Sequence, residues 1–167
     1  MEDRGRHILL KEYSIRKASL EDLPVLLEFE QGLIRDERPF DPTIKDGKIS
    51  YYSLEELIIQ ENSDIYVVEK NGTILASGSV QIKKDRTYLK HDVIGYLGFM
   101  YVRPEARGLG LNQLIVDALE AWCKQRGLSE LKLTVYTDNL PALRAYDKAG
   151  FQKHMITMRK NLSDESP

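Results

Sequence analysis

The run of residues 93–102 constrains the fold more than any other part of this chain. It is ten residues long, carries no charge and is apolar at both odd and even positions. A strand with one face in water would alternate, so this strand must be covered on both faces. Arg103-Pro104 ends it, Gly108 and Gly110 follow, and apolar residues then recur at helical spacing as far as Gly127. A buried strand, a glycine turn and an amphipathic helix together predict an α/β architecture with helices packed on a sheet.

The rest of the chain supplies elements for the same sheet. Asn71-Gly72 lies between two strand-like segments and indicates a tight hairpin, because both central residues need positive φ. Ser19 with Asp22, and Ser53 with Glu56, have capping-box spacing and predict two helix starts. We therefore expect strands at 13–18, 65–69, 73–83, 93–102, 130–137 and 151–159, helices at 19–34, 54–59, 111–126 and 141–149, and a surface loop at 35–52. This order predicts a mixed sheet.

Composition indicates one globular domain and excludes several kinds of function. The chain has 167 residues, of which 42% are hydrophobic and 30% charged, so one core can hold it without disulfides. We assign residues 1–12 to an N-terminal extension, 13–162 to the domain and 163–167 to a polar tail. The net charge of −2 provides no field for nucleic acid. The longest apolar run is about half a membrane span.

Further expectations concern location and metals. Residues 1–11 lack the features of a secretory signal, so we expect a cytoplasmic protein. Cys123 is the single cysteine and cannot pair within the chain. His7, His91 and His154 have no ligand spacing, and we predict no metal.

The turn before the strong helix has the features of an anion site. Backbone N–H groups in the first turn of a helix lack intrahelical partners and lie at the positive end of the dipole, where they bind phosphate oxygens. Gly108 and Gly110 allow close approach of the backbone. Neither the dinucleotide fingerprint nor the P-loop pattern fits, because Gln113 stands where a third glycine is required and no Gly-Lys-Ser/Thr is present. Taken alone, the two glycines are explained equally well by a tight strand-to-helix turn that binds no anion.

A second motif changes that balance. Residues 139–151 contain Asn139, Ala142, Tyr146, Gly150 and Phe151. The pattern N-x-x-A-x-x-x-Y-x-x-x-G-F, following R/Q-x-x-G-x-G/A in the right order, resembles the GCN5-related N-acetyltransferase (GNAT) superfamily over residues 93–159. The loop motif ends in Asn112 where the family usually has Gly or Ala.

The resemblance implies a fold in which the fourth strand (93–102) and the fifth (130–137) splay apart around the pantetheine arm of acetyl-CoA, the implied cosubstrate. It implies transfer of the acetyl group directly to a primary amine of a small molecule or peptide. The residues that would contact acetyl-CoA are the backbone of Met100, Tyr101 and Val102, the loop Arg107, Gly108, Leu109, Gly110, Leu111 and Asn112, and Asn139.

The reaction requires an acid for the leaving thiolate and a path for the proton of the amine. By the family resemblance Tyr146 is the candidate acid, although packing of a short helix is the alternative for any one of nine tyrosines. A backbone N–H of the fourth strand is the natural oxyanion donor. The sequence does not identify the base that takes the proton of the amine. Tyr96 stands where many members have Glu, and a chain of water molecules that ends on an acidic or histidine side chain explains the proton path equally well. The candidates for that side chain are Glu28, Glu30, Asp92 and His91.

The acceptor is not identified by the sequence. In the family, the first two helices and their loop form one acceptor wall, here about 20–62, and this region is rich in carboxylates that would attract a cationic amine. A helix face exposed to solvent explains these carboxylates better than an acceptor site does. The carboxylates are Glu28, Glu30, Asp36, Glu37, Asp41, Glu55 and Glu56.

Two broader questions also stay open in the sequence. A cofactor-binding sensor without catalysis is an alternative function, motivated by Tyr96 and Asn112. A homodimer is one possible state that the resemblance implies, because the last strand would offer an exposed edge.

Overall fold

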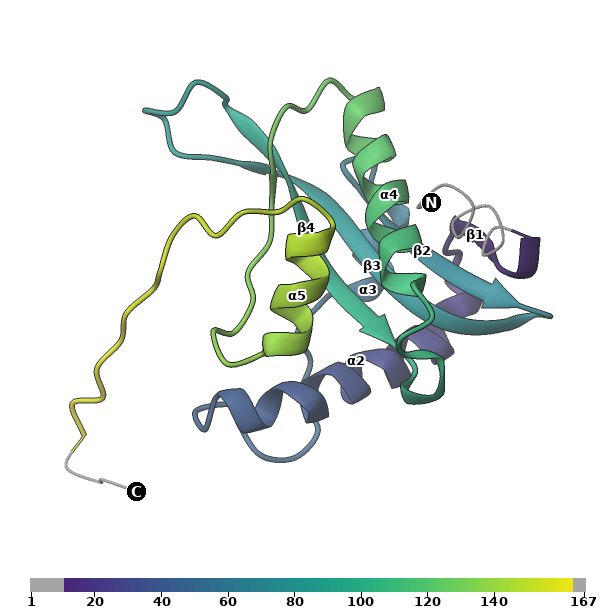
Figure 1. The fold of residues 1–167 in the computed structure, drawn as a ribbon, viewed down its shortest axis with the longest axis horizontal. Helices are drawn as coiled ribbons and strands as arrows, with labels where there is room; N and C mark the ends of the chain where they lie inside the picture. The colour runs from purple at the N-terminus through teal and green to yellow at the C-terminus, as the bar shows by residue number, and fades with distance from the viewer. Residues whose placement is uncertain (1–10, 164–167) are drawn as a thin grey trace.

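The computed structural model describes residues 11–163 and contains a five-stranded mixed sheet (Figure 1). Its strands are β1 (Ser14–Lys17), β2 (Ser63–Lys70), β3 (Thr73–Lys84), β4 (Val93–Val102) and β5 (Leu131–Lys132). They follow one another across the sheet in chain order. Neighbours are antiparallel except β4 and β5, which are parallel. The predicted mixed sheet is therefore confirmed.

Helices cover both faces of this sheet. One core lies under α4 (Leu111–Gln125) and contains Leu97 and Trp122; the other lies under α2 (Leu23–Glu37) and α3 (Leu54–Ile59) and contains Phe29 and Phe99. In Figure 1, α4 lies across β2 and β3, and α5 (Leu140–Lys148) follows β5 along the chain. Short 3-10 turns complete the set: η1 (Leu20–Asp22), η2 (Arg38–Phe40) and η3 (Pro104–Ala106).

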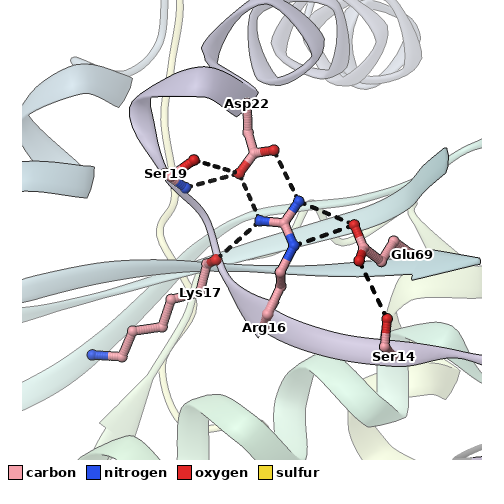
Figure 2. A network of polar contacts seen from close by, with 6 residues as sticks. All are labelled: Ser14, Arg16, Lys17, Ser19, Asp22 and Glu69. Carbon is pink, nitrogen blue, oxygen red and sulfur yellow. Dashed lines mark hydrogen bonds and ion pairs between the residues drawn. The ribbon is translucent and has the colours of Figure 1, made fainter. Parts of the chain in front are cut away.

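A polar network fixes the start of α2 against the edge of the sheet (Figure 2). The Arg16 guanidinium donates to both carboxylate oxygens of Asp22, at 2.7 and 2.9 Å, and to Glu69 at 3.0 and 3.2 Å. The Ser19 N–H also donates to Asp22, at 2.8 Å, as the capping-box spacing predicts. Asp22 is 8% exposed, and its contact with Arg16 lowers the pKa of its carboxyl. The network joins β1, β2 and α2.

Three predicted segments differ in the structure. The predicted loop begins later, because α2 continues past Gly32 to Glu37. The predicted strand at 130–137 forms only at Leu131–Lys132, and the predicted last strand at 151–159 does not form. Alternation of side chains gives a strand its two faces, but a strand also needs a neighbour to pair with. Within residues 11–163, none pairs with 133–137 or 151–159.

Candidate functional site

The centre of the candidate site is a bulge in β4. Ser79 pairs with Gly98 and Ser77 with Tyr101, so β4 has one residue more than β3 over this stretch. Phe99 takes up the extra length in the left-handed region, with φ of 50°. Its N–H is directed away from the ladder and donates to the Tyr52 hydroxyl over 3.1 Å, while its carbonyl accepts from the Ser77 hydroxyl over 3.1 Å. The bulge therefore releases one backbone amide from the sheet.

β4 and β5 separate just before the bulge. They pair only at Gly95 with Leu131 and Tyr96 with Lys132. The hydroxyls of Tyr96 and Thr134 lie 3.0 Å apart and connect β4 to the segment that follows β5, next to the last backbone pair of the two strands. The predicted splay of the fourth and fifth strands is thus present.

The three residues proposed for the pantetheine arm lie past the point of separation. Tyr101 and Val102 pair with Ser77 and Ala76 of β3. In the described part of the chain, no strand pairs with the opposite edge of Met100, Tyr101 or Val102. That edge is available to the amides of an extended ligand.

The turn before α4 has the geometry expected of an anion site. Gly108 and Gly110 have φ of 77° and 83°, and Gly110 is the N-cap of α4. The amides of Gln113 and Leu114 both donate to the Gly110 carbonyl, at 3.1 and 3.4 Å. Between residues 11 and 163, no backbone carbonyl accepts from the amides of 108–112. These amides are consistent with a pyrophosphate cradle at the positive end of the helix dipole.

Other parts of the same loop anchor it to the fold. The Arg107 guanidinium donates to Asp36 over 2.6 Å and to the Val102 carbonyl over 3.1 Å, so it joins the loop to α2 and β4. Leu111 is buried in the core, whereas Leu109 is 45% exposed. Asn112 is half-buried in the first turn of α4.

The second motif places its tyrosine close to the bulge. Asn139 accepts from the Ala142 amide over 3.3 Å and caps α5, an engagement that the resemblance did not indicate. The Tyr146 ring lies 5.9 Å from the ring of Phe151. Burial raises the pKa of the Tyr146 phenol well above its usual range, and the neighbouring Tyr52 and Glu37 act in the same direction. Tyr146 therefore holds its proton at neutral pH.

Further aromatic rings gather around Tyr52, whose hydroxyl also raises the pKa of Tyr146. The Tyr52 ring lies 5.5 Å from Phe99 and 6.1 Å from Tyr51. Near them, Phe40 and Tyr136 stack with their centroids 5.9 Å apart. The Tyr51 hydroxyl is buried and lies close to the Glu37 carboxylate; burial and this contact raise the pKa of the phenol. The result is a group of phenols around the amide of Phe99.

One carboxylate stands out next to these phenols. Glu37, the last residue of α2, has its pKa raised by burial and by the negative charge of Asp36. Its own charge raises the pKa of Tyr51, Tyr52 and Tyr146. The sequence placed Glu37 among the acidic residues of 20–62 and did not single it out. Its position next to these tyrosines depends on where α2 ends, which the sequence did not predict.

The acids considered earlier as ends of a proton path have other partners. Glu30 is 1% exposed, and one of its oxygens accepts from the amides of Tyr51 and Tyr52, at 2.6 and 3.0 Å. Glu28 is on the surface, 3.7 Å from Arg103. Glu30 is thus a support for the tyrosine-bearing loop.

The remaining two candidates lie at the other end of β4. His91 pairs with Asp85 over 2.7 Å, and the Asp92 carbonyl accepts from the Asp85 amide. The Tyr96 ring packs under the Lys83 ammonium, 3.9 Å from its centroid.

A hollow of about 590 Å³ lies beside this site, between α2 and the end of β4. Arg35, Lys48 and Arg103 line it, together with Phe29 and Tyr101. Neither Tyr52 nor Tyr146 lines this hollow. The hollow is therefore separate from the candidate site at the bulge.

The splayed strands and the turn before α4 are the features expected of the GNAT class of acetyltransferases. Residues 31–151 match the acetyltransferase (GNAT) family, and the chain belongs to that family.

Known proteins support the assignment. An uncharacterized N-acetyltransferase of Methanocaldococcus jannaschii is 25% identical over 149 residues, which are 89% of this chain and 64% of that protein. The mycothiol acetyltransferase of Geodermatophilus obscurus is 31% identical over 65 residues, covering 39% of this chain and 21% of the relative. The chain thus spans less than two thirds of the length of these relatives.

Solved structures share the fold. A tetramutant of a Bacillus halodurans protein superposes with a TM-score of 0.78 at 19% identity, covering 89% of this chain and 99% of that one. An acetyltransferase of Clostridium acetobutylicum, solved with acetyl-CoA, gives 0.68 at 22% identity, covering 90% and 96%.

Two further features are absent from residues 11–163. None of their helices is both long and apolar enough to cross a membrane. No three of their His, Cys, Asp or Glu side chains gather closely enough to hold a metal ion.

Proposed function

We propose that the protein transfers the acetyl group of acetyl-CoA to a primary amine of a small-molecule or peptide acceptor, and that Tyr146 protonates the leaving thiolate. The observation that carries this proposal is the Phe99 N–H, which the bulge of β4 turns out of the sheet toward the half-buried phenol of Tyr52. An N–H held in that position is suited to the negative oxygen that develops on an attacked thioester.

The residues present fit acetyl-CoA. The amides of 108–112, from which no backbone carbonyl of residues 11–163 accepts, would bind the pyrophosphate at the start of α4. The edge of Met100, Tyr101 and Val102 on which no described strand pairs would offer backbone groups to the pantetheine amides, with the Val102 carbonyl exchanging its contact with Arg107. Asn139, at the start of α5, would lie alongside the arm. When bound, acetyl-CoA supplies the thioester carbonyl; the protein positions it.

The chain's own groups account for each proton. The ammonium would first lose one proton to Glu37, whose charge acts on Tyr146 and Tyr51. The neutral nitrogen would then bond to the carbonyl carbon, while the Phe99 N–H, leaving the Tyr52 hydroxyl, donates to the oxyanion. As the carbon–sulfur bond breaks, Tyr146 would give its proton to sulfur, and the second proton that the nitrogen loses would return to the Tyr146 phenolate. A raised carboxyl pKa brings this group nearer to the operating pH, which suits a base.

Replacement of one phenol tests the role of Tyr146. Thermal unfolding with and without acetyl-CoA measures binding, and thiol release across a panel of amines measures turnover. For Tyr146→Phe we expect turnover to fall about 10²- to 10⁴-fold, with unchanged stabilisation by acetyl-CoA, because only the proton donor is removed. Tyr88→Phe is the matched control, since Tyr88 is 74% exposed. Undiminished turnover in Tyr146→Phe would refute the acid assignment.

A pH profile separates the two roles. In the parent protein kcat/KM should rise with pH as Glu37 loses its proton, at a pH above the ordinary carboxyl range. Glu37→Gln should lose that limb and most of its activity while still binding acetyl-CoA. An unchanged profile in Glu37→Gln would exclude this carboxylate as the base. Binding of acetyl-CoA without turnover of any amine would instead indicate a sensor.

A further inference from the structure

The hollow between α2 and the end of β4 has the size and the charge of a ligand site. Its volume of about 590 Å³ is within the range of pockets that hold small molecules. Three cationic side chains line it, those of Arg35, Lys48 and Arg103. Among the described residues of the lining, Glu28 supplies the one carboxylate. The whole chain has a net charge of −2, so this excess of positive charge is local, and in a concave site it attracts anions.

Both walls of the hollow are fixed by the fold. The Gln31 side-chain amide donates to the Ile49 carbonyl over 2.8 Å, and the Arg38 guanidinium donates to the Gly47 carbonyl. These bonds hold the loop that carries Lys48 next to α2. The opposite wall is a face of α2 on which the lining residues recur at spacings of three and four: Pro24, Leu27, Glu28, Gln31 and Arg35.

Arg103 has the properties of a carboxylate-binding residue. Its Nε donates to the Ile74 carbonyl over 2.9 Å, which holds the guanidinium in place. Within residues 11–163 no group accepts a hydrogen bond from its terminal nitrogens, and the Glu28 carboxylate is 3.7 Å away. Arg16, by contrast, donates to both oxygens of Asp22, at 2.7 and 2.9 Å (Figure 2). Arg103 therefore offers the same planar pair of donors, already oriented, to a carboxylate that enters the hollow.

The rest of the lining is largely apolar. Leu27 is 48% exposed, and Pro24 and Pro104 are exposed beside it. The rings of Phe29 and Tyr101, with centroids 4.9 Å apart, form the buried part of the lining. An inorganic anion would fill a small part of this volume and leave the apolar side chains in water. The lining suits an anion that carries an apolar body.

We propose that this hollow binds a small organic acid, whose carboxylate pairs with Arg103 and Lys48 and whose aromatic or aliphatic body covers Leu27 and the two prolines. The site is distinct from the one proposed for catalysis, because neither the loop 108–112 nor Tyr146 lines it. The inference therefore does not depend on the proposed function.

An NMR titration of the full chain with 2-naphthoate tests the site, with the uncharged 2-naphthamide as the matched ligand. Naphthoate should shift the amides of 25–35 and 101–103. Naphthamide should bind about tenfold more weakly or worse, because it cannot form the charge-assisted pair. Saturating acetyl-CoA should leave naphthoate bound. Equal binding of the two ligands, displacement of naphthoate by acetyl-CoA, or an absence of these shifts would overturn the proposal.

Two variants test whether the hollow holds the naphthoate. Arg103→Gln removes a cation, and Leu27→Glu places a carboxylate in the lining; each should weaken naphthoate binding about tenfold or more. Arg86→Gln and Leu20→Glu are the matched controls, because Arg86 is exposed, Leu20 is 50% exposed, and neither lines the hollow. Both controls should bind naphthoate as the parent does.

Circular dichroism checks that each variant is folded. Leu27→Glu changes a side chain that is already half in water, so it keeps the test valid if loss of the Arg103 contact with the Ile74 carbonyl unfolds Arg103→Gln. Naphthoate binding that Leu27→Glu leaves at the parent value would refute the assignment of this site.

Discussion

Replacing Glu30 by Ala should release the loop that carries two of the site's tyrosines. One oxygen of this buried carboxylate accepts from the amides of Tyr51 and Tyr52 and from the Ser50 hydroxyl, at 2.6, 3.0 and 3.0 Å. Tyr52 in turn accepts from the Phe99 amide, over 3.1 Å. The substitution therefore acts on stability through the loop and on the site through Tyr52.

The expected cost follows from these three bonds. A buried donor left without a partner costs about 1–3 kcal/mol. Ser50 is exposed, so water replaces its bond; the two amides are partly accessible, and about 1 kcal/mol for each is appropriate. Loss of packing at a side chain that is 1% exposed adds to this. We expect Glu30→Ala to lower the free energy of unfolding by about 2–3 kcal/mol, equivalent to roughly 5–10 °C in Tm.

Urea unfolding followed by Trp122 fluorescence measures the change, because this is the single tryptophan and it is 1% exposed. Glu28→Ala is the matched control: it lies on the same helix, its side chain is 70% exposed, and its contact with Arg103 is 3.7 Å long. It should cost less than about 0.5 kcal/mol. If both variants lose the same stability, the carboxylate of Glu30 does not hold the loop.

Three further changes test other parts of the structure. Gly108→Ala should weaken acetyl-CoA binding and cost about 1 kcal/mol of stability, since φ of 77° is unfavourable for Ala although its Cβ would touch nothing within 4 Å; a binding titration and a melting curve check both. Gly78→Ala should cost about 1–3 kcal/mol in urea unfolding, because its Cβ would overlap Ile115 of α4. Because Arg16 lowers the pKa of Asp22, their contact stabilises the fold above the ordinary carboxyl pKa of about 4, and this stability is lost as pH falls through the lower folded value. Asp22→Asn should therefore be less stable at pH 7 and should flatten the acid limb of stability against pH.

Much of the fold was predictable because its signals are local. Asn71 and Gly72 both have positive φ, 51° and 76°, as the Asn-Gly pair requires in a two-residue hairpin. The start of α4 at Gly110 and the end of α5 near Gly150 follow from glycines at the helix boundaries. In each case the residues that determine the conformation lie within a few positions of it.

The bulge of β4 was not predictable in this way. A phenylalanine rarely adopts positive φ, and nothing in residues 93–102 marks Phe99 as the exception. Its conformation depends on Ser77 and Tyr52, which lie 22 and 47 positions away. The same holds for Glu37, because only the length of α2 brings it close to the tyrosines. It holds also for the strand predicted at 151–159, which has no neighbouring strand among residues 11–163.

The bulge has a consequence for how the protein unfolds. Leu97 packs into the core under α4, whereas Phe99 and Tyr101, at the same parity along the strand, pack into the core under α2 and α3. A regular strand would have sent all three to one face. Because one strand contributes to both cores on either side of the bulge, separating either layer of helices disturbs the strand that the other layer needs. The two halves of the molecule should therefore lose their structure in one cooperative transition, with the amides of β3 and β4 exchanging only as the whole domain opens.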